Sequence, residues 1–156
     1  MVGEPDQAGP GGVTSEGDGA ERPRLSVSSF PKKKRRTSEA SFERQFDKAL
    51  AACGIKSRHM AMREAGWPDR YATGGIWIEL KSLDTLGTDN GTSKEQRIKL
   101  NDLHAAGDRV FYCAKFEDSF ILKPWSEIRG KNLKGIERYH YGRRGDIEHA
   151  IRHEIL

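Results

Sequence analysis

Residues 66–81, with the sequence GWPDRYATGGIWIELK, constrain the fold of this chain more than any other stretch. Two short runs that favour an extended backbone flank a Thr-Gly-Gly turn at residues 73–75, and the second run opens with Ile-Trp-Ile. This pattern predicts a β-hairpin. Because successive side chains of a strand point to opposite faces, we expect Glu79 and Lys81 on one face and Leu80 on the other.

A hairpin of this length brings Asp69, at the start of its first run, back towards Glu79 near the end of the second. Two carboxylates bind a hard cation such as Mg²⁺ through oxygen, and the cation lowers the pKa of a bound water and neutralises phosphate charge. Lys81 supplies a compact positive charge that can hold the attacking water or a phosphate oxygen. The backbone carbonyl of Leu80 is a further candidate oxygen ligand. These residues therefore form a candidate site for metal-dependent phosphodiester hydrolysis.

Each half of this pattern also has an ordinary structural explanation. Glu-Leu-Lys is usually the solvated side of a half-buried strand, and Pro-Asp is usually a turn. Both halves, in order and across one predicted hairpin, favour the catalytic interpretation.

The same stretch resembles the VRR-NUC group of the PD-(D/E)xK nuclease superfamily. The resemblance covers residues 38 to about 125 and is carried by Gly66-x-Pro68-Asp69, then Glu79-x-Lys81, then Gln96 at the opening of the next predicted helix. Two positions depart from the pattern, because typical members have a small aliphatic residue in place of Trp67 and Gly in place of Ser82. Neither position is an expected ligand.

The resemblance implies a Mg²⁺-dependent DNA endonuclease, with Mn²⁺ able to substitute for Mg²⁺. Asp69 and Glu79 would bind the metal, Lys81 would position or activate the attacking water, and Gln96 would support the arrangement. Small stand-alone members of the family are associated with phage replication and repair, resemble Holliday-junction resolvases and are commonly homodimers. A structure-specific enzyme acting on branched DNA is therefore the expectation by analogy.

Two supporting residues carry structural alternatives. The family has a glutamate on an N-terminal helix that supports the metal cluster, and Glu43 matches it best, although an acid near a helix start is also favoured by the helix dipole. Gln96 stands three residues after Ser93 and fits a capping box as well as a site residue. For Gln96, both roles can hold at once.

Hydrophobic periodicity predicts a small α/β domain over residues 38–128, with a mixed sheet flanked by helices. One helix is expected from Ser38 to Gly54 and a second from Ser93 to Gly107; their apolar positions are Phe42, Phe46, Ala49 and Leu50 in the first, and Ile98, Leu100, Leu103 and Ala106 in the second. Residues 110–114 and 120–122 are predicted as strands. Residues 55–65 fit either a short helix or an irregular strand.

Composition sets both ends of the chain apart from this domain. Residues 1–30 hold six of the 17 Gly and three of the six Pro, so the segment 1–37 is expected to be a disordered tail. Residues 129–156 are expected to be a basic extension, with an amphipathic helix formed by Ile147, Ala150, Ile151 and Leu156. This extension suits nucleic-acid contact, and packing or dimerisation has an equal claim on it.

The tail contains a block of five consecutive positive charges after Pro31, formed by Lys32, Lys33, Lys34, Arg35 and Arg36. Such a block binds phosphate backbones without sequence preference, and it also resembles a nuclear localisation signal. The DNA-binding arm is the simpler interpretation.

The expected partner is DNA, with no small-molecule cofactor and no membrane, since no apolar run approaches the roughly 20 residues of a membrane span. The expected location is intracellular, in the cytoplasm of a bacterial host, or in the nucleus if the basic block acts as a nuclear localisation signal.

The alternative function is a non-catalytic nucleic-acid-binding or adaptor protein on a vestigial nuclease fold. An RNA-directed nuclease is a third possibility, but the sequence has no aromatic RNA-binding signature.

Deleting residues 1–37 separates the two interpretations of the basic block. If the block is a DNA-binding arm, the deletion should weaken binding to all DNAs alike and reduce the salt dependence of binding, because fewer counterions are released. Binding titrations at several salt concentrations measure both effects. Unchanged affinity and salt slope, with loss of nuclear accumulation of a fused reporter, would favour the localisation signal.

Overall fold

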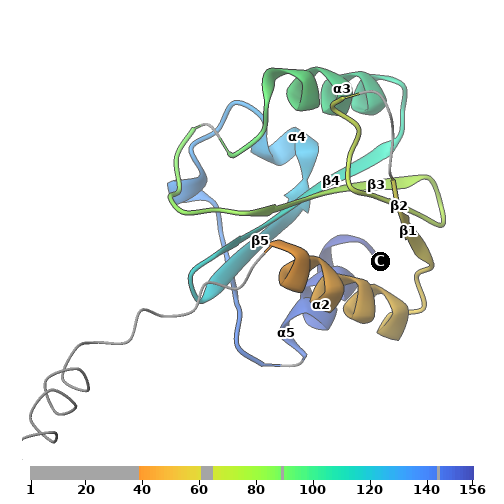
Figure 1. The fold of residues 1–156 in the computed structure, drawn as a ribbon, viewed down its shortest axis with the longest axis vertical. Coiled ribbons are helices and arrows are strands. Elements are labelled where there is room, and N and C mark those ends of the chain that lie inside the picture. The colour runs from red at the N-terminus through yellow and green to blue at the C-terminus, as the bar shows by residue number, and fades with distance from the viewer. Residues whose placement is uncertain (1–38, 61–64, 89, 144) are drawn as a thin grey trace, which may run out of the picture. The chain divides into compact units, whose positions relative to one another are not determined.

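The computed structural model describes residues 39–60, 65–88, 90–143 and 145–156. The predicted tail and its basic block lie outside these ranges. With the labels of Figure 1, the elements in chain order are α2 (Glu39–Ala52), β1 (Ser57–His59), β2 (Arg70–Ala72), β3 (Ile76–Ser82), α3 (Lys94–Ala105), β4 (Arg109–Phe116), β5 (Ser119–Pro124), α4 (Trp125–Ile128), the 3₁₀ helix η2 (Leu133–Gly135), β6 (Tyr139–His140) and α5 (Asp146–Glu154).

The six strands form one sheet in the order β1-β2-β3-β4-β5-β6. Strands β3 and β4 are parallel, and every other neighbouring pair is antiparallel, so the sheet is mixed. Helices α2 and α5 lie on one face of the sheet and α3 and α4 on the other (Figure 1). The prediction of a small mixed sheet flanked by helices is therefore confirmed.

The predicted hairpin is also confirmed. Strand β2 pairs with β3 in antiparallel register, with Ala72 opposite Ile76, which leaves residues 73–75 as the turn. Gly74 and Gly75 have φ angles of 93° and 71° in this turn, a region that side chains with a Cβ rarely enter. The Thr-Gly-Gly sequence therefore fixes where the chain reverses.

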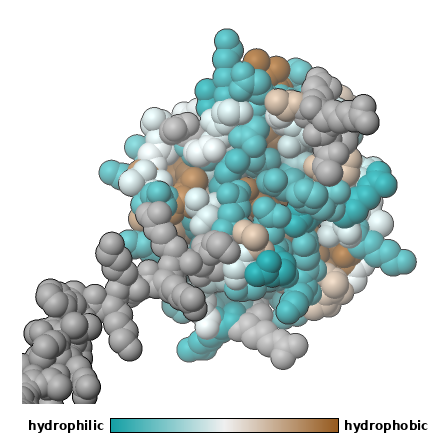
Figure 2. Space-filling model, viewed as in Figure 1, coloured by the Kyte–Doolittle hydropathy of each residue, from teal (hydrophilic) through white to brown (hydrophobic). Residues whose placement is uncertain are grey.

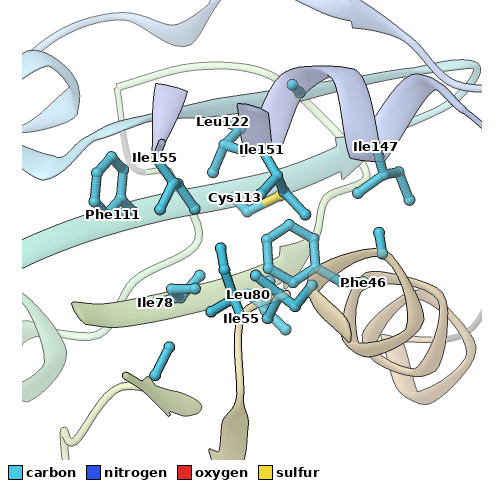
Figure 3. Packing of buried hydrophobic residues seen from close by; sticks show 14 of the residues in the cluster. Phe46, Ile55, Ile78, Leu80, Phe111, Cys113, Leu122, Ile147, Ile151 and Ile155 are labelled. Atoms are coloured by element: carbon cyan, nitrogen blue, oxygen red, sulfur yellow. The ribbon is translucent and has the colours of Figure 1, made fainter. Parts of the chain in front are cut away.

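Two apolar cores lie on the two faces of the sheet. The first is packed between the sheet and helices α2 and α5, and Figure 3 shows Ile78 and Leu80 of β3 directed into it with Phe46 and Ile151. The second lies on the α3 and α4 face and is built around Leu100, Tyr112, Ile121, Trp125 and Ile128. The alternation along β3 and β4 divides each strand between both cores, as expected for strands buried on both faces.

Helix α2 confirms the helix predicted from Ser38, and its four predicted apolar residues are all buried. Helix α3 confirms the helix predicted from Ser93, which caps it by accepting from the Gln96 backbone N–H at 3.1 Å. The apolar stripe predicted for α3 is wrong at two positions: Leu100 is fully buried and Leu103 half-buried, but Ile98 is 50% exposed and Ala106, just after the helix, is also exposed. Residues two apart on a helix differ by about 200° in direction, so Ile98 and Leu100 cannot both face the sheet.

Residues 55–65, which periodicity left undecided, begin the sheet. Ile55 is buried in the first core, and β1 follows it as an edge strand paired with β2. Positions 61–64 of this segment lie outside the described residues.

The segment 129–156 contributes to the same sheet and core as the rest of the domain. Strand β6 pairs with β5, and Ile147, Ala150 and Ile151 of α5 are buried beside α2 in the first core. The expectation that Leu156 belongs to this apolar stripe is wrong, because Leu156 is 69% exposed while Ile155 is 2% exposed. Helix α5 ends at Glu154, so the residues after it no longer follow the helical spacing.

Hydrophilic residues cover most of the described surface in the view of Figure 2, and apolar residues appear there in small separate groups. None of the helices in the described ranges combines the length and apolar character of a membrane-spanning segment.

Helix α3 offers a matched pair of substitutions that test its orientation. Leu100→Ala should lower the free energy of unfolding by about 2–5 kcal/mol, because it removes a fully buried side chain and leaves a cavity. Ile98→Ala, on the same helix but half exposed, should change it by less than about 1 kcal/mol. Urea denaturation of both variants measures the difference, and equal losses would contradict the packing described for α3.

Candidate active site

The site is built on the second half of β3, where the strand alternation places Leu80 in the first core and Glu79 and Lys81 on the opposite face. The Glu79 side chain is fully buried, whereas Lys81 retains 17% exposure. Helix α3 covers Glu79, because the Gln96 side-chain amide donates to Glu79 Oε1 at 2.8 Å. The same side chain accepts from the Ser93 backbone N–H at 2.9 Å, so Gln96 completes the helix cap and also contacts the site.

The two oxygens of the Glu79 carboxylate differ in their surroundings. Oε1 accepts from Gln96 and also lies 2.9 Å from the Lys81 ammonium. Oε2 is buried and has no hydrogen-bond partner among the residues that the structure describes. A buried carboxylate oxygen without a partner is unfavourable, so this atom marks a position where a ligand would stabilise the site.

Asp69 immediately precedes β2 and continues the hairpin register to the position opposite Glu79. Its Oδ2 accepts from the Leu80 backbone N–H at 2.8 Å. Since the N–H and C=O of one strand residue point towards the same neighbouring strand, the Leu80 carbonyl is directed to the same edge of β3. The structure thus brings Asp69, Glu79, Lys81, Gln96 and the Leu80 backbone into one group.

Both carboxyl groups of this pair have raised pKa values. Burial, together with the nearby Asp69 charge, raises the pKa of Glu79 from 4.5 to about 7, although Lys81 opposes the shift. Burial also raises the pKa of Asp69, while the Leu80 N–H works in the other direction and the Glu43 charge adds to the rise. Negative charge is therefore held at this site at a free-energy cost in the absence of a cation.

Glu43, the predicted supporting glutamate, faces a different residue. Its carboxylate lies 2.8 Å from the guanidinium of Arg70, which is 5% exposed, and Asp47 binds the same guanidinium at 2.8 Å and 3.0 Å. Arg70 also donates to the carbonyl of Asp69 at 3.0 Å. Glu43 therefore pairs with Arg70 at the border of the site. An interaction with the helix dipole does not explain Glu43, because the acid in the first turn of α2 is Glu39.

Sequence reasoning missed two residues of this region, Glu39 and Arg70. Burial raises the pKa of Glu39, with Lys81 lowering it and Asp69 raising it, which places Glu39 beside the site. A signal for Glu39 was present, because Glu39, Glu43 and Asp47 recur every four residues and therefore line one face of α2. Arg70 gave no signal of its own, since an arginine in a strand is usually exposed.

Gly66, which opens the Gly66-x-Pro68-Asp69 motif, has a packing role. Its φ is 97°, and a Cβ at this position would lie 2.7 Å from the backbone carbonyl oxygen of Glu95 in α3. The absence of a side chain lets the chain before Asp69 pass close to the start of α3, which carries Gln96. This contact links the two halves of the site.

The oxygen donors suited to a hard cation are Asp69, Glu79 Oε2 and the Leu80 carbonyl. Within the described ranges, no group of three or more His, Cys, Asp or Glu side chains is arranged to hold a metal ion. Two carboxylates with a backbone carbonyl nevertheless fit Mg²⁺, which keeps several of its own waters and is commonly held by one or two carboxylates.

No protein-family model matches the chain, and no curated protein matches its sequence. Among solved structures, the chain is similar to Hjc of Archaeoglobus fulgidus, a Holliday junction resolvase from an archaeal hyperthermophile. The two are 21% identical over 60% of this chain and 84% of Hjc, with a TM-score of 0.44. A likeness at this level carries no conclusion about function, which has to come from the site itself.

The raised pKa of Glu79 predicts a pH-dependent effect of Glu79→Gln on stability. The folded state binds a proton at Glu79 more tightly than the unfolded chain does, so stability is lost as the pH rises from about 4.5 through about 7. Without added metal, Glu79→Gln should be more stable than the wild type at pH 8, by up to about 3 kcal/mol, and equal to it at pH 4.5. Denaturation at both pH values measures the gain.

Glu127→Gln is the matched control, because Glu127 is exposed in α4 and away from the second core. It should show no gain at either pH. A Glu79→Gln variant that is no more stable than the wild type at pH 8 would contradict the burial of a strained carboxylate at this position.

Proposed function

We propose that the chain is a divalent-metal-dependent nuclease of the PD-(D/E)xK superfamily that hydrolyses phosphodiester bonds in DNA. The observation that carries the proposal is the fully buried Glu79 carboxylate, which has one oxygen bound by Lys81 and Gln96 and the other without a partner among the described residues. Beside it lies Asp69, a second carboxylate with a raised pKa.

A solely structural role for Glu79 is a poor explanation of this geometry. A structural carboxylate at a buried position normally has all its oxygens hydrogen-bonded, since each unpaired polar group costs about 1–3 kcal/mol. The unpaired oxygen of Glu79 belongs to the same group as Asp69 and the Leu80 backbone, since Asp69 accepts from the Leu80 N–H. Strain of this kind, with strongly raised pKa values, is typical of functional sites.

The charge balance of the region also favours a cation. Glu39, Glu43, Asp47, Asp69 and Glu79 are five carboxylates, and Arg70 and Lys81 are two cations, which leaves three negative charges without compensation when all are ionised. A phosphate would be repelled by such a group. A bound divalent cation lowers the pKa of a metal-bound water and neutralises phosphate charge, and it would lower this repulsion.

The residues of the chain have separable roles in this proposal. Asp69, Glu79 Oε2 and the Leu80 carbonyl would hold the cation. Lys81 already places its ammonium at the edge of the carboxylate pair, from which it can hold the attacking water or a phosphate oxygen. Gln96 fixes the orientation of the Glu79 carboxylate by donating to Oε1, the oxygen that is not assigned to the cation.

We further propose that the protein belongs to the VRR-NUC group and uses Mg²⁺, with Mn²⁺ as a substitute. Its substrate would be branched or junction DNA, and it would act as an intracellular homodimer. The support for these assignments is the motif from Gly66 to Lys81 followed by Gln96. The basic block from Lys32 to Arg36 would add DNA affinity from the tail.

Single-turnover cleavage of branched, single-stranded and duplex DNA, with and without Mg²⁺, tests the function. Asp69→Asn and Glu79→Gln should abolish Mg²⁺-dependent cleavage while remaining folded.

Lys81→Arg should bind DNA with wild-type affinity in Ca²⁺ but cleave at least tenfold more slowly, equivalent to about 1.4 kcal/mol of lost transition-state stabilisation. The reason is that a planar guanidinium would misplace the attacking water or the phosphate oxygen.

Lys131→Arg is the matched control for the lysine, since Lys131 is exposed and distant from β3 in the chain. It should cleave at the wild-type rate. Cleavage by Asp69→Asn or Glu79→Gln at the wild-type rate would contradict the site assignment. DNA binding with no cleavage of any substrate would favour the adaptor alternative.

A further inference from the structure

Three aromatic rings lie against one another next to the site and are not used by the proposed chemistry. Trp77 of β3 is 4.6 Å from Tyr71 of β2 and 5.2 Å from Trp67, measured between ring centroids. All three side chains are half-buried. We call Trp67, Tyr71 and Trp77 the aromatic strip.

The aromatic strip shares a sheet face with the candidate site. Trp77 precedes Glu79 by two residues, Tyr71 follows Asp69 by two, and Tyr71 stands opposite Trp77 in the hairpin. Because alternate residues of a strand share a face, Trp77 and Glu79 point to the same side of β3, and Tyr71 pairs with Trp77 across the hairpin. Trp67 reaches this side through its contact with Trp77. Alternate Cα atoms are about 7 Å apart, or about two nucleotide steps of ~3.4 Å along a stacked strand.

Two cations lie over the rings of the strip. The Arg58 guanidinium is 5.7 Å from the centroid of Tyr71, and the Lys99 ammonium is 4.3 Å from that of Trp67. Arg58 comes from β1 and Lys99 from α3, so positive charge flanks the strip on both sides. Aromatic rings that stack on bases, together with nearby cations that attract the phosphates, are the combination used to bind unpaired nucleic acid.

Sheet stability alone explains only part of this arrangement. A cross-strand aromatic pair stabilises a sheet by about 0.2–1 kcal/mol, which accounts for Tyr71 opposite Trp77. It does not account for Trp67, which precedes β2 and brings a third ring to the same place.

We propose that the aromatic strip stacks unpaired bases of a DNA substrate one or two nucleotides from the cleaved phosphate. The preferred substrate would then carry unpaired bases next to the cut, as at a flap, a fork or the branch point of a junction. This inference rests on the proposed nuclease site, because the position of the scissile phosphate is set by Asp69 and Glu79. A fully paired duplex keeps its bases stacked inside the helix and gains nothing from the strip.

Replacing bases by abasic sites in an unpaired arm tests the inference, because this change removes the bases and keeps the backbone and its charge. Binding to a flap DNA and to its abasic counterpart is titrated in Ca²⁺ at fixed salt. The wild type should prefer the base-containing flap at least fivefold, as expected for one stacked base. Trp67→Leu should lose most of this preference, Trp67→Phe should retain most of it, and affinity for a paired duplex should change in neither.

Tyr141→Leu is the matched control. Tyr141 is also half-buried and has a cation over its ring, Lys115 at 4.9 Å, but it packs against the first core on the other face. It should keep the wild-type preference. Equal affinity of the wild type for the two flaps would overturn the inference and needs no variant, so a misfolded Trp67→Leu cannot leave the inference untested.

The binding result is independent of cleavage. A protein that cleaves DNA but binds both flaps equally would refute the role of the strip and leave the nuclease site standing. A protein that prefers bases in the arm, with the preference lost in Trp67→Leu, but never cleaves would support base stacking and contradict the nuclease. The two failures are therefore distinguishable.

Discussion

The Glu79 carboxylate contacts the Lys81 ammonium on a strand in the middle of the sheet. The surrounding elements have to supply the other partners that this buried carboxylate needs. A buried carboxylate is unfavourable unless charged and hydrogen-bonding partners surround it. Lys81 supplies the charge from the same face of the same strand, and Gln96 supplies the hydrogen bond only because α3 docks over that face. That docking in turn needs a glycine at position 66, where any Cβ would meet the backbone of α3.

Helix α2 extends the same electrostatic problem to the other side of the hairpin. Its acids Glu39 and Glu43 lie near Asp69, and Asp47 follows them on the same face of the helix. Such a row would repel itself and the site if nothing separated them. Arg70 stands between them, binding Glu43 and Asp47 while its neighbour Asp69 remains available on the edge of β3. The planar guanidinium, which can bind two carboxylates at once, suits this position better than an ammonium would. Arg70 therefore joins α2 to the hairpin as well as bordering the site.

The sequence was sufficient for features that depend on local rules. The turn glycines, the alternation along β3 and the Ser93 cap each predict a structure from a few neighbouring residues, and each is found as predicted. The arrangement of α2 was less accessible, because the partner of Glu43 depends on which face of the helix meets β2. Ile98 shows the same limit within one helix, since an apolar residue in a helical stretch does not reveal which direction the sheet lies in. The aromatic strip was hidden for a similar reason, because Trp67, Tyr71 and Trp77 become neighbours only once the hairpin has formed.

Charge is distributed unequally around the Asp69 and Glu79 carboxylates, which affects the direction from which a polyanion would approach them. On the α2 side, Glu39 and Glu43 lie close to the pair, and Arg70 is already bound by Glu43 and Asp47. On the other side, Arg58 of β1 and Lys99 in the middle of α3 flank the aromatic strip. A phosphate backbone approaching past Glu39 and Glu43 would be repelled by these two carboxylates, because charges closer than the ~8–10 Å Debye length are weakly screened. A strand approaching Asp69 and Glu79 over the aromatic strip would meet Arg58 and Lys99, so in the proposed function the charges and the rings would direct a substrate along the same path.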